Sequence, residues 1–268
     1  MTLSRSRIAI TTALVLFPSC QTNGGSSRIE AKVEPETALA AYIERRVSEF
    51  SAIDTERRTD LDALSEELAN WLRQGQALPM TFICTHNSRR SHMAQIWAQC
   101  AARRHGLDGV RTFSGGTEAT AFNPRAVAAI LRAGLTVEIR VDGENPVYVV
   151  EDGQGDGMRC WSKVFSDDAN PSANFVAVMT CQSADEACPF VPGAQLRVAL
   201  PYVDPKASDG TEREAAAYDE RCAQIAREML YLFAEVGKRL DRRRIRRAAR
   251  RRRRAPRARG LRRSGASS

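Results

Sequence analysis

The sequence predicts an α/β fold, a three-layer αβα sandwich built on a mostly parallel sheet. From Met80 onward, short apolar runs typical of buried strands alternate with amphipathic helical patterns. The joins between them are short, as in parallel sheets whose two faces are covered by helices. Hydrophobic residues make up 43% of the 268 residues, which is enough for one sizeable core.

Two amphipathic helices are expected before this alternation begins. Apolar side chains recur every three or four positions over residues 36–50 and 59–73, which is the spacing of one helix face. Thr59 is the expected N-cap of the second helix. Residues 30–78 are therefore predicted to form an N-terminal helical pair.

The main domain is predicted over residues 79–240. A β-hairpin insertion over residues 145–165 interrupts the alternation and turns at the glycines of "DGQGDG". Pro124 opens one helix at the position that proline prefers. The predicted strands cover residues 80–84, 110–116, 175–180 and 196–200, and the predicted helices cover residues 91–106, 123–134 and 212–240.

The N-terminal segment, residues 1–29, has the composition of an export leader. A basic stretch is followed by the apolar run "IAITTALVLF", a small-residue end and a polar tether. The apolar run is too short to span a membrane. Cys20 resembles a lipoprotein acylation site, so the protein is expected to be exported and lipid-anchored if the leader functions. If the start is misassigned, it is expected to be cytoplasmic.

Residues 241–268 form an arginine-rich tail that is predicted to be disordered. Fourteen arginines and no acidic residue lie between Arg242 and Arg263, so the formal charge of +8 leaves about −6 on residues 1–241. Such a segment binds nucleic acid or an anionic membrane surface by counterion release. A nucleic-acid- or anion-binding module is one candidate function, and a solvated extension is the other interpretation.

Cys84 is predicted to lie where the first strand ends and a polar loop leads into a helix. Arg90 follows after five intervening residues, and Ser91 comes next. Backbone N–H groups in such a loop form a nest for anions, and the helix dipole adds positive potential there. The thiol is therefore expected to ionise easily, with Ser91 donating to the sulfur and Arg90 clamping a tetrahedral oxyanion. A buried, inert cysteine is the alternative.

The segment "FICTHNSRRSHMAQ" resembles the active-site loop of the low-molecular-weight protein tyrosine phosphatases and of the thioredoxin-coupled arsenate reductases that share their fold. Three further segments follow in the expected order. "SGGTEATAFNPRAVAAILRAG" is similar to the family's second strand and helix, "VMTCQSADEACP" to the two-cysteine segment of the reductases, and "YVDPK" to the Asp-Pro loop. The resemblance covers about residues 80–238 and implies the three-layer sandwich of this family.

The resemblance also implies roles for individual residues. Cys84 becomes the nucleophile, Arg90 the oxyanion clamp with Ser91 beside it, and Asp204 the acid that protonates the departing oxygen. An ordinary Asp-Pro turn is the alternative for Asp204. Asn87 suits a turn that needs positive φ. The implied oxyanion-binding set is His86, Asn87, Ser88, Arg89 and Arg90.

Cys181 and Cys188 decide between two activities. In the reductases, the residue matching Cys181 attacks the nucleophile's sulfur, and the residue matching Cys188 takes over the disulfide, which a thioredoxin then reduces. We therefore expect a monomeric arsenate reductase with thioredoxin or a similar dithiol as partner and no cofactor. A low-molecular-weight protein tyrosine phosphatase that hydrolyses phosphate monoesters is the alternative, and both thiols would then be incidental.

Several features depart from the family pattern or fall outside it. His86 stands where glycine is usual, and Arg89 where a second loop cysteine is usual. The hairpin insertion is not typical of the reductases and is expected to cap the site or contact a partner. His92 and His105 are expected on a helix surface, and no histidine has metal-like spacing to the cysteines. Three cysteines are expected to be packing residues: Cys100, Cys160 and Cys222.

Overall fold

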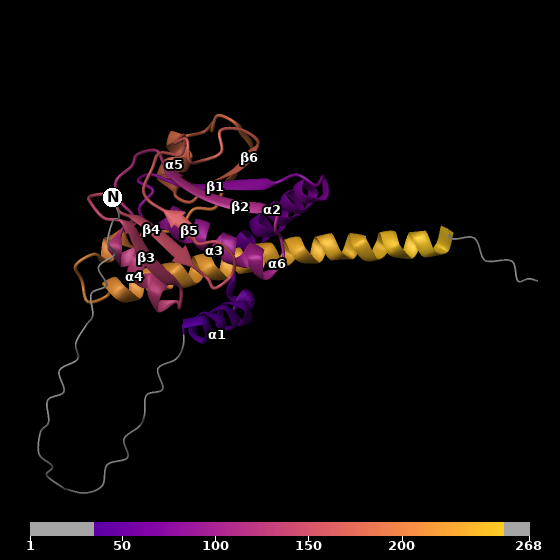
Figure 1. Cartoon of the computed structure of the whole chain (residues 1–268), viewed down its shortest axis with the longest axis horizontal. Coiled ribbons are helices and arrows are strands. Elements are labelled where there is room, and N and C mark those ends of the chain that lie inside the picture. The colour runs from indigo at the N-terminus through magenta and orange to yellow at the C-terminus, as the bar shows by residue number, and fades with distance from the viewer. Residues whose placement is uncertain (1–34, 255–268) are drawn as a thin grey trace, which may run out of the picture. The chain divides into compact units, whose positions relative to one another are not determined.

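A computed structural model describes residues 35–254 of the chain (Figure 1). A four-stranded parallel sheet in the order β2-β1-β6-β7 forms its centre. The carboxyl ends of β1 and β2 lie at the same level, because their last residues, Cys84 and Gly116, pair with each other. Strand β6 ends one residue earlier relative to β1, because its last residue, Met179, pairs with Ile83. The strands are β1 (Leu78–Cys84), β2 (Val110–Gly116), β6 (Phe175–Met179) and β7 (Ala194–Ala199).

Helices cover both faces of this sheet, as the sequence predicts. In Figure 1, α3 and α6 lie on one side of β1 and β2, and the short α5 lies on the other. The first turn of α4 begins at Pro124, as expected. The helices are α1 (Pro35–Ser48), α2 (Thr55–Arg73), α3 (Arg90–Arg104), α4 (Pro124–Arg132), α5 (Gln182–Ala187) and α6 (Glu214–Arg254), with 3-10 turns η1 (Phe50–Ala52) and η2 (Pro205–Ser208).

Alternate residues of β1 supply two apolar cores. Met80 and Phe82 are fully buried in a large core that also holds Trp97 of α3 and Phe233 of α6. Ile83 faces a smaller core on the side of α5. This alternation is the two-residue period of a strand buried on both faces. It stops at the last residue of the strand, because Cys84 belongs to the smaller core together with Ile83.

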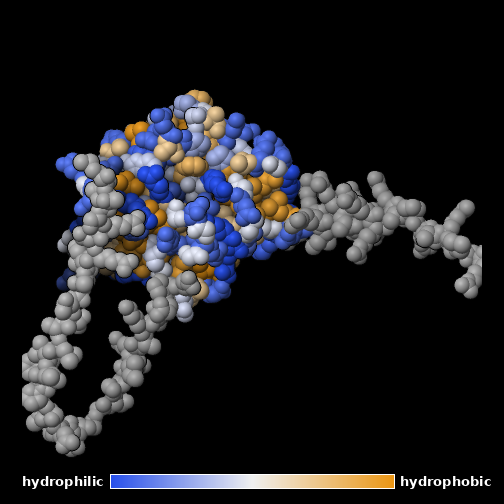
Figure 2. Space-filling model, viewed as in Figure 1, coloured by the Kyte–Doolittle hydropathy of each residue, from blue (hydrophilic) through white to orange (hydrophobic). Residues whose placement is uncertain are grey.

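The predicted hairpin insertion belongs to a second, antiparallel sheet. It pairs β4 (Val147–Glu151) with β5 (Met158–Cys160), and β4 also pairs with β3 (Thr136–Val141), which the sequence prediction did not include. Figure 2 shows mostly hydrophilic side chains with smaller apolar groups between them on one face of the molecule.

The N-terminal helical pair is part of the main body and not a domain of its own. Leu61 and Leu68 of α2 are fully buried in the same core as Phe82, and the described residues, 35–254, all belong to one compact unit. The N-cap prediction was wrong. Helix α2 starts a turn earlier, where the Asp54 side chain accepts a 2.8 Å hydrogen bond from the N–H of Arg57, and Thr59 is internal.

The disorder predicted for residues 241–268 requires correction over residues 241–254. Helix α6 continues to Arg254, because arginine is a good helix former and the run contains neither glycine nor proline before Pro256. The predicted leader, with Cys20, and residues 255–268 lie outside the described residues. Within the described part of the chain, no helix has the length and apolar character needed to cross a membrane.

Candidate functional site

The loop after β1 is held against the end of β2. Cys84 is the last residue of β1, residues 85–89 form the loop, and α3 begins at Arg90. The main chain of Gly116 lies so close that a Cβ there would stand 2.7 Å from the amide nitrogen of Asn87 and 2.7 Å from the carbonyl oxygen of Thr85. Only glycine therefore fits at this position, which accounts for the end of the "SGG" segment.

Asn87 is the residue that turns the loop. Its φ is +43°, so the predicted positive φ is confirmed. The buried side chain uses both of its ends: Nδ2 donates to Ser91 Oγ at 2.9 Å, and Oδ1 accepts from the N–H of Lys163 at 3.0 Å. His86 keeps a negative φ, so a side chain in place of the usual glycine is compatible with the turn.

Ser91 lies beside the sulfur of Cys84, with 3.1 Å between Oγ and Sγ. Both residues are buried. The Ser91 oxygen accepts a hydrogen bond from Asn87 Nδ2, and its hydroxyl hydrogen is free to donate to the sulfur.

The loop leaves a set of unpaired donors beside the thiol. Among the described residues, no backbone N–H from residue 85 to residue 90 donates to a protein acceptor. The loop is braced through other atoms: Ser88 Oγ donates to the carbonyl of Ala121 at 2.7 Å, and the carbonyl of His86 accepts from Ser162 Oγ at 2.9 Å. Consecutive free N–H groups at the start of a helix are suited to binding an anion.

Arg90 and Asp204 meet across the site, although they are far apart in the sequence. Arg90 Nη2 lies 2.7 Å from Asp204 Oδ2, and Nη1 donates to the carbonyl of Tyr202 at 2.9 Å. The Nε atom of Arg90 is buried and has no hydrogen-bond partner among the described residues. Asp204 is also the N-cap of η2, because Oδ1 accepts from the N–H of Lys206 at 3.1 Å.

Cys181 lies close to the loop and Cys188 lies further away. The sulfur of Cys181 is buried, 3.5 Å from the Oγ1 of Thr85 and 3.4 Å from the N–H of Ala184, which it caps at the start of α5. Cys84 and Cys181 share the smaller core, and Cys188 packs against it from a half-buried position. The segment between them is the helix α5.

The other cysteines described are packing residues, as predicted. Cys100, Cys160 and Cys222 are buried. Burial raises the pKa of Cys160 to about 12 and that of Cys222 to about 11, so both remain thiols at neutral pH.

The predicted surface position of His92 was wrong. The ring is fully buried, with Nδ1 3.1 Å from Ser114 Oγ and its face stacked on Phe122 at 4.1 Å between centroids. Burial, together with the charge of Lys163, holds the pKa of His92 well below its usual range, so the ring is neutral. Helix α3 is buried on nearly all sides, and a helical period alone does not reveal that. His105, in contrast, is exposed as predicted.

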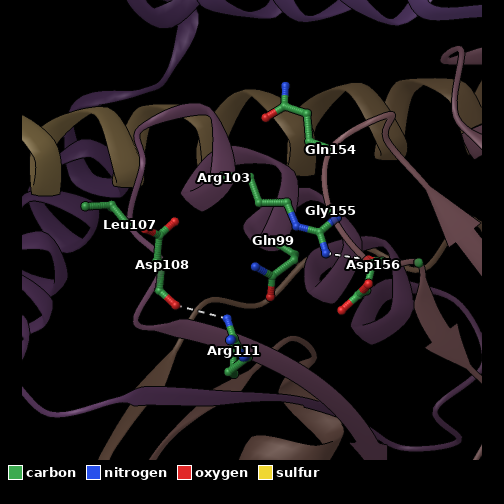
Figure 3. Close-up of a pocket in the computed structure, with 9 residues that line it drawn as sticks. Gln99, Arg103, Leu107, Asp108, Arg111, Gln154, Gly155 and Asp156 are labelled. Carbon is green, nitrogen blue, oxygen red and sulfur yellow. Dashed lines mark hydrogen bonds between the residues drawn. The ribbon is translucent and has the colours of Figure 1, made fainter.

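The hairpin tip does not cap the Cys84 loop. Arg103 near the far end of α3 pairs with Asp152 at 2.7 Å and donates to the carbonyl of Asp156. Arg103 is thirteen residues from Arg90, about 20 Å along the helix. A polar cavity of about 630 Å³ lies at this end. Figure 3 draws the residues that line it: Gln99, Arg103, Leu107, Asp108, Arg111, Gln154, Gly155, Asp156 and Gly157.

The base of the insertion does reach the loop. Beyond β5, Ser162 and Lys163 bond to His86 and Asn87, and the carbonyl of Lys163 accepts from the N–H of Gly116 at 2.8 Å. Sequence reasoning missed these supports, and it also missed the contacts of Arg89 with the Tyr218 hydroxyl at 2.8 Å and with Asp209 Oδ2 at 3.6 Å, because each contact joins segments that are distant in the chain.

A parallel α/β sheet whose first strand ends in a thiol beside an arginine-bearing loop is an arrangement suited to enzymes that use a cysteine nucleophile on oxyanions. Residues 79–144 match the family model of the low molecular weight phosphotyrosine protein phosphatases. An arsenate reductase of Bacillus licheniformis is 30% identical over 156 residues, covering 58% of this chain and 94% of that protein. An arsenate reductase of Bacillus subtilis is 29% identical over 157 residues, covering 59% of this chain and 95% of that protein.

A solution structure of a low molecular weight protein tyrosine phosphatase from Bacillus subtilis is 18% identical, with a TM-score of 0.42 over 60% of this chain and 98% of that one. The identity to the Bacillus licheniformis protein, over nearly its whole length, establishes the family. The chain belongs to the superfamily of low-molecular-weight protein tyrosine phosphatases and arsenate reductases, and it is an enzyme of one of these two types.

Proposed function

We propose that the protein is an arsenate reductase that uses Cys84, Cys181 and Cys188 in a relay and a thioredoxin-type dithiol as reductant. The observation that carries the proposal is the position of Cys181. Its sulfur lies 3.5 Å from Thr85, the residue next to Cys84, and a third, half-buried thiol lies seven residues further on. A phosphatase hydrolyses its cysteinyl ester with water and needs neither thiol.

The first step forms a thiol ester of arsenate. The Cys84 thiolate, hydrogen-bonded by Ser91, attacks arsenic(V), while the free N–H groups of the loop and Arg90 hold the oxyanion. One arsenic–oxygen bond breaks as the sulfur–arsenic bond forms. Asp204 gives its proton to the departing oxygen, which leaves as water. Binding requires Arg90 to exchange Asp204 for the anion.

The second step is the reduction. The Cys181 thiolate attacks the sulfur of Cys84, and the electron pair of the sulfur–arsenic bond passes to arsenic, which leaves as arsenite. Cys84 and Cys181 are then joined in a disulfide. The Cys188 thiolate attacks the sulfur of Cys181, releases Cys84 as a thiolate and leaves a Cys181–Cys188 disulfide for the external dithiol to reduce.

The last transfer requires α5 to unwind. Cys181 and Cys188 flank the six residues of this helix, so their Cα atoms lie about 10 Å apart at 1.5 Å per residue. A disulfide needs Cα atoms about 4.4–6.8 Å apart. A helix this short has little stability of its own, so unwinding it requires little free energy. The unwinding brings Cys188 toward Cys181.

Phosphomonoester hydrolysis shares the first step, but no further feature of the described residues favours it. Tyr202, the aromatic residue near Asp204, is buried, and its ring lies 5.3 Å from the guanidinium of Arg57. It is therefore not available to hold a phosphotyrosine ring. The side chains of the arginine-rich tail lie outside the described residues and add no support for a nucleic-acid-binding module.

The test is arsenate-dependent NADPH oxidation by the full chain with thioredoxin and thioredoxin reductase. The same assay is run on Cys84→Ser, Cys181→Ser and Cys188→Ser, with Cys222→Ser as a matched control at a packing cysteine. The proposal expects turnover that all three relay variants abolish and the control retains. Aryl-phosphate hydrolysis that requires Cys84 and survives loss of Cys181 and Cys188, without arsenate turnover, would identify a phosphatase instead.

A further inference from the structure

Arg89 stands beside Arg90 in the loop, but its guanidinium binds the segment that carries Asp204. Its Nε donates to the hydroxyl of Tyr218 at 2.8 Å and lies 4.0 Å from Asp204 Oδ1. Its Nη2 lies 3.6 Å from Asp209 Oδ2. The Arg89 side chain is only 11% exposed, whereas those of Asp204 and Asp209 are 31% and 23% exposed.

The three contacts bracket the short turn η2. Asp204 is the N-cap of η2 and Asp209 is its C-cap, so Arg89 reaches both ends of the turn. Tyr218 of α6 completes the bracket, because its hydroxyl accepts from Arg89 and donates to Asp209 Oδ1 at 2.8 Å. Arg89 thereby ties the segment 204–209 to the loop that follows Cys84.

Arg89 and Arg90 bind Asp204 in different ways. Arg90 forms the short contact, 2.7 Å to Oδ2, and this contact is lost when Arg90 turns to an oxyanion. The contacts of Arg89 to Asp209 and Tyr218 remain, and they need neither a charge on Asp204 nor Arg90 in its present place. A protonated Asp204 has no ion pair to hold it, so its position depends on the hydrogen bond from the N–H of Lys206 within η2 and on the contacts that fix η2 itself, those of Arg89 among them.

We infer that Arg89 is a positioning residue that keeps Asp204 over the reacting oxyanion after Arg90 has turned to bind it. The inference rests on the proposed thiol-ester chemistry and goes beyond it, because it assigns Arg89 to proton delivery in place of oxyanion binding. Arg89 touches neither the substrate nor the moving proton. It acts through η2, and the proton passes from the Asp204 carboxyl to the oxygen whose bond to arsenic or phosphorus is breaking.

The test compares two aryl phosphates that differ in their need for a proton. Phenolate is a poor leaving group that requires an acid, whereas 2,4-dinitrophenolate leaves without one. The value of kcat/KM is measured because it reports the steps up to ester formation. Full-length wild type and Arg89→Met are compared, with Arg132→Met as a control. Arg132 forms an ion pair with Asp219 of α6 and does not touch η2.

Arg89→Met is expected to lower kcat/KM for phenyl phosphate about tenfold or more beyond its effect on the dinitrophenyl ester, since a positioned acid supplies a factor of about 10²–10⁴. In an Asp204→Asn background, the added Arg89→Met change is expected to affect both esters alike, because no acid remains to position. Arg132→Met is expected to produce no selective loss. Tyr218→Phe removes one contact of the bracket and is expected to produce a smaller loss of the same selectivity.

An equal fall for both esters in Arg89→Met would overturn the inference and assign Arg89 to oxyanion binding or to folding. If Arg89→Met does not fold, Tyr218→Phe decides in the same way. Either result for the variants leaves the proposed function intact, because the wild-type chain still turns over its substrates. A wild-type chain that attacks neither ester and yields no arsenite from arsenate would overturn the proposed function, and this inference with it.

Discussion

The opening of α5 is the step on which the cysteine relay depends, and Arg197 is the residue that opposes it. From β7, Arg197 Nη2 donates to the carbonyl of Asp185 at 2.8 Å and pairs with its Oδ1 at 2.6 Å, while Nε donates to the carbonyl of Cys188 at 3.0 Å. All three contacts must break if Cys188 is to move from about 10 Å to disulfide distance from Cys181.

The perturbation is Arg197→Met. Hydrogen bonds to a charged group contribute about 1.5–3 kcal/mol each, but these side chains are a quarter to a third exposed, so we take about 2 kcal/mol for the set. Loss of the Arg197 contacts favours the unwound form of α5 and therefore the Cys181–Cys188 disulfide. The expected change is about thirtyfold in the thiol–disulfide equilibrium constant, or about 40 mV in reduction potential.

The assay is equilibration of the Cys84→Ser chain with mixtures of reduced and oxidised dithiothreitol, with the Cys181–Cys188 disulfide quantified by mass spectrometry. Arg111→Met is the matched control, because Arg111 also lies on a parallel strand and donates to main-chain carbonyls only, those of Asp108 and Val110. An equilibrium constant that Arg197→Met changes less than twofold would refute the argument that α5 must open against these contacts.

Three further outcomes are expected. Ser91→Ala is expected to lower kcat/KM for arsenate about tenfold to a hundredfold in the coupled assay, because the sulfur of Cys84 loses its 3.1 Å donor; an effect below twofold would contradict this. Phe190→Ser is expected to raise KM for thioredoxin without slowing reductant-free arsenite formation, because this side chain, 74% exposed and two residues from Cys188, is placed to contact a partner; an unchanged KM would count against it.

The third outcome concerns His92, whose pKa is lowered in the folded state. The unfolded chain takes up a proton below about pH 6.5 and the folded chain does not, so stability is lost as pH falls through that value. Urea unfolding is expected to show that wild type loses about 1.4 kcal/mol more than His92→Gln between pH 7.5 and pH 5.5. Equal losses would mean that the folded chain protonates His92.

The local features of the site could be predicted from the sequence. An apolar run that ends in Cys84, a polar loop and a helical pattern place the thiol at a strand–helix join, and Asn87 supplies the left-handed turn. These predictions depend on neighbouring residues and on one period of side-chain alternation, so the local chain contains the information they need.

The contacts between distant segments could not be predicted in the same way. The pairing of Arg90 with Asp204 depends on β7 lying two strands away from β1, and the support of Asn87 by Lys163 depends on the path of the chain after β5. The burial of His92 depends on Phe122 covering it. Each is a consequence of packing between elements, and no local pattern contains it.

The most direct test of the three-cysteine relay is a single turnover of the reduced full-length chain with arsenate and no external reductant. Arsenite and the thiols are then quantified together by mass spectrometry. The relay predicts one arsenite per chain, one disulfide between Cys181 and Cys188, and Cys84 recovered as a free thiol. Recovery of all three thiols in reduced form with no arsenite, from a chain that still hydrolyses aryl phosphates through Cys84, would contradict it.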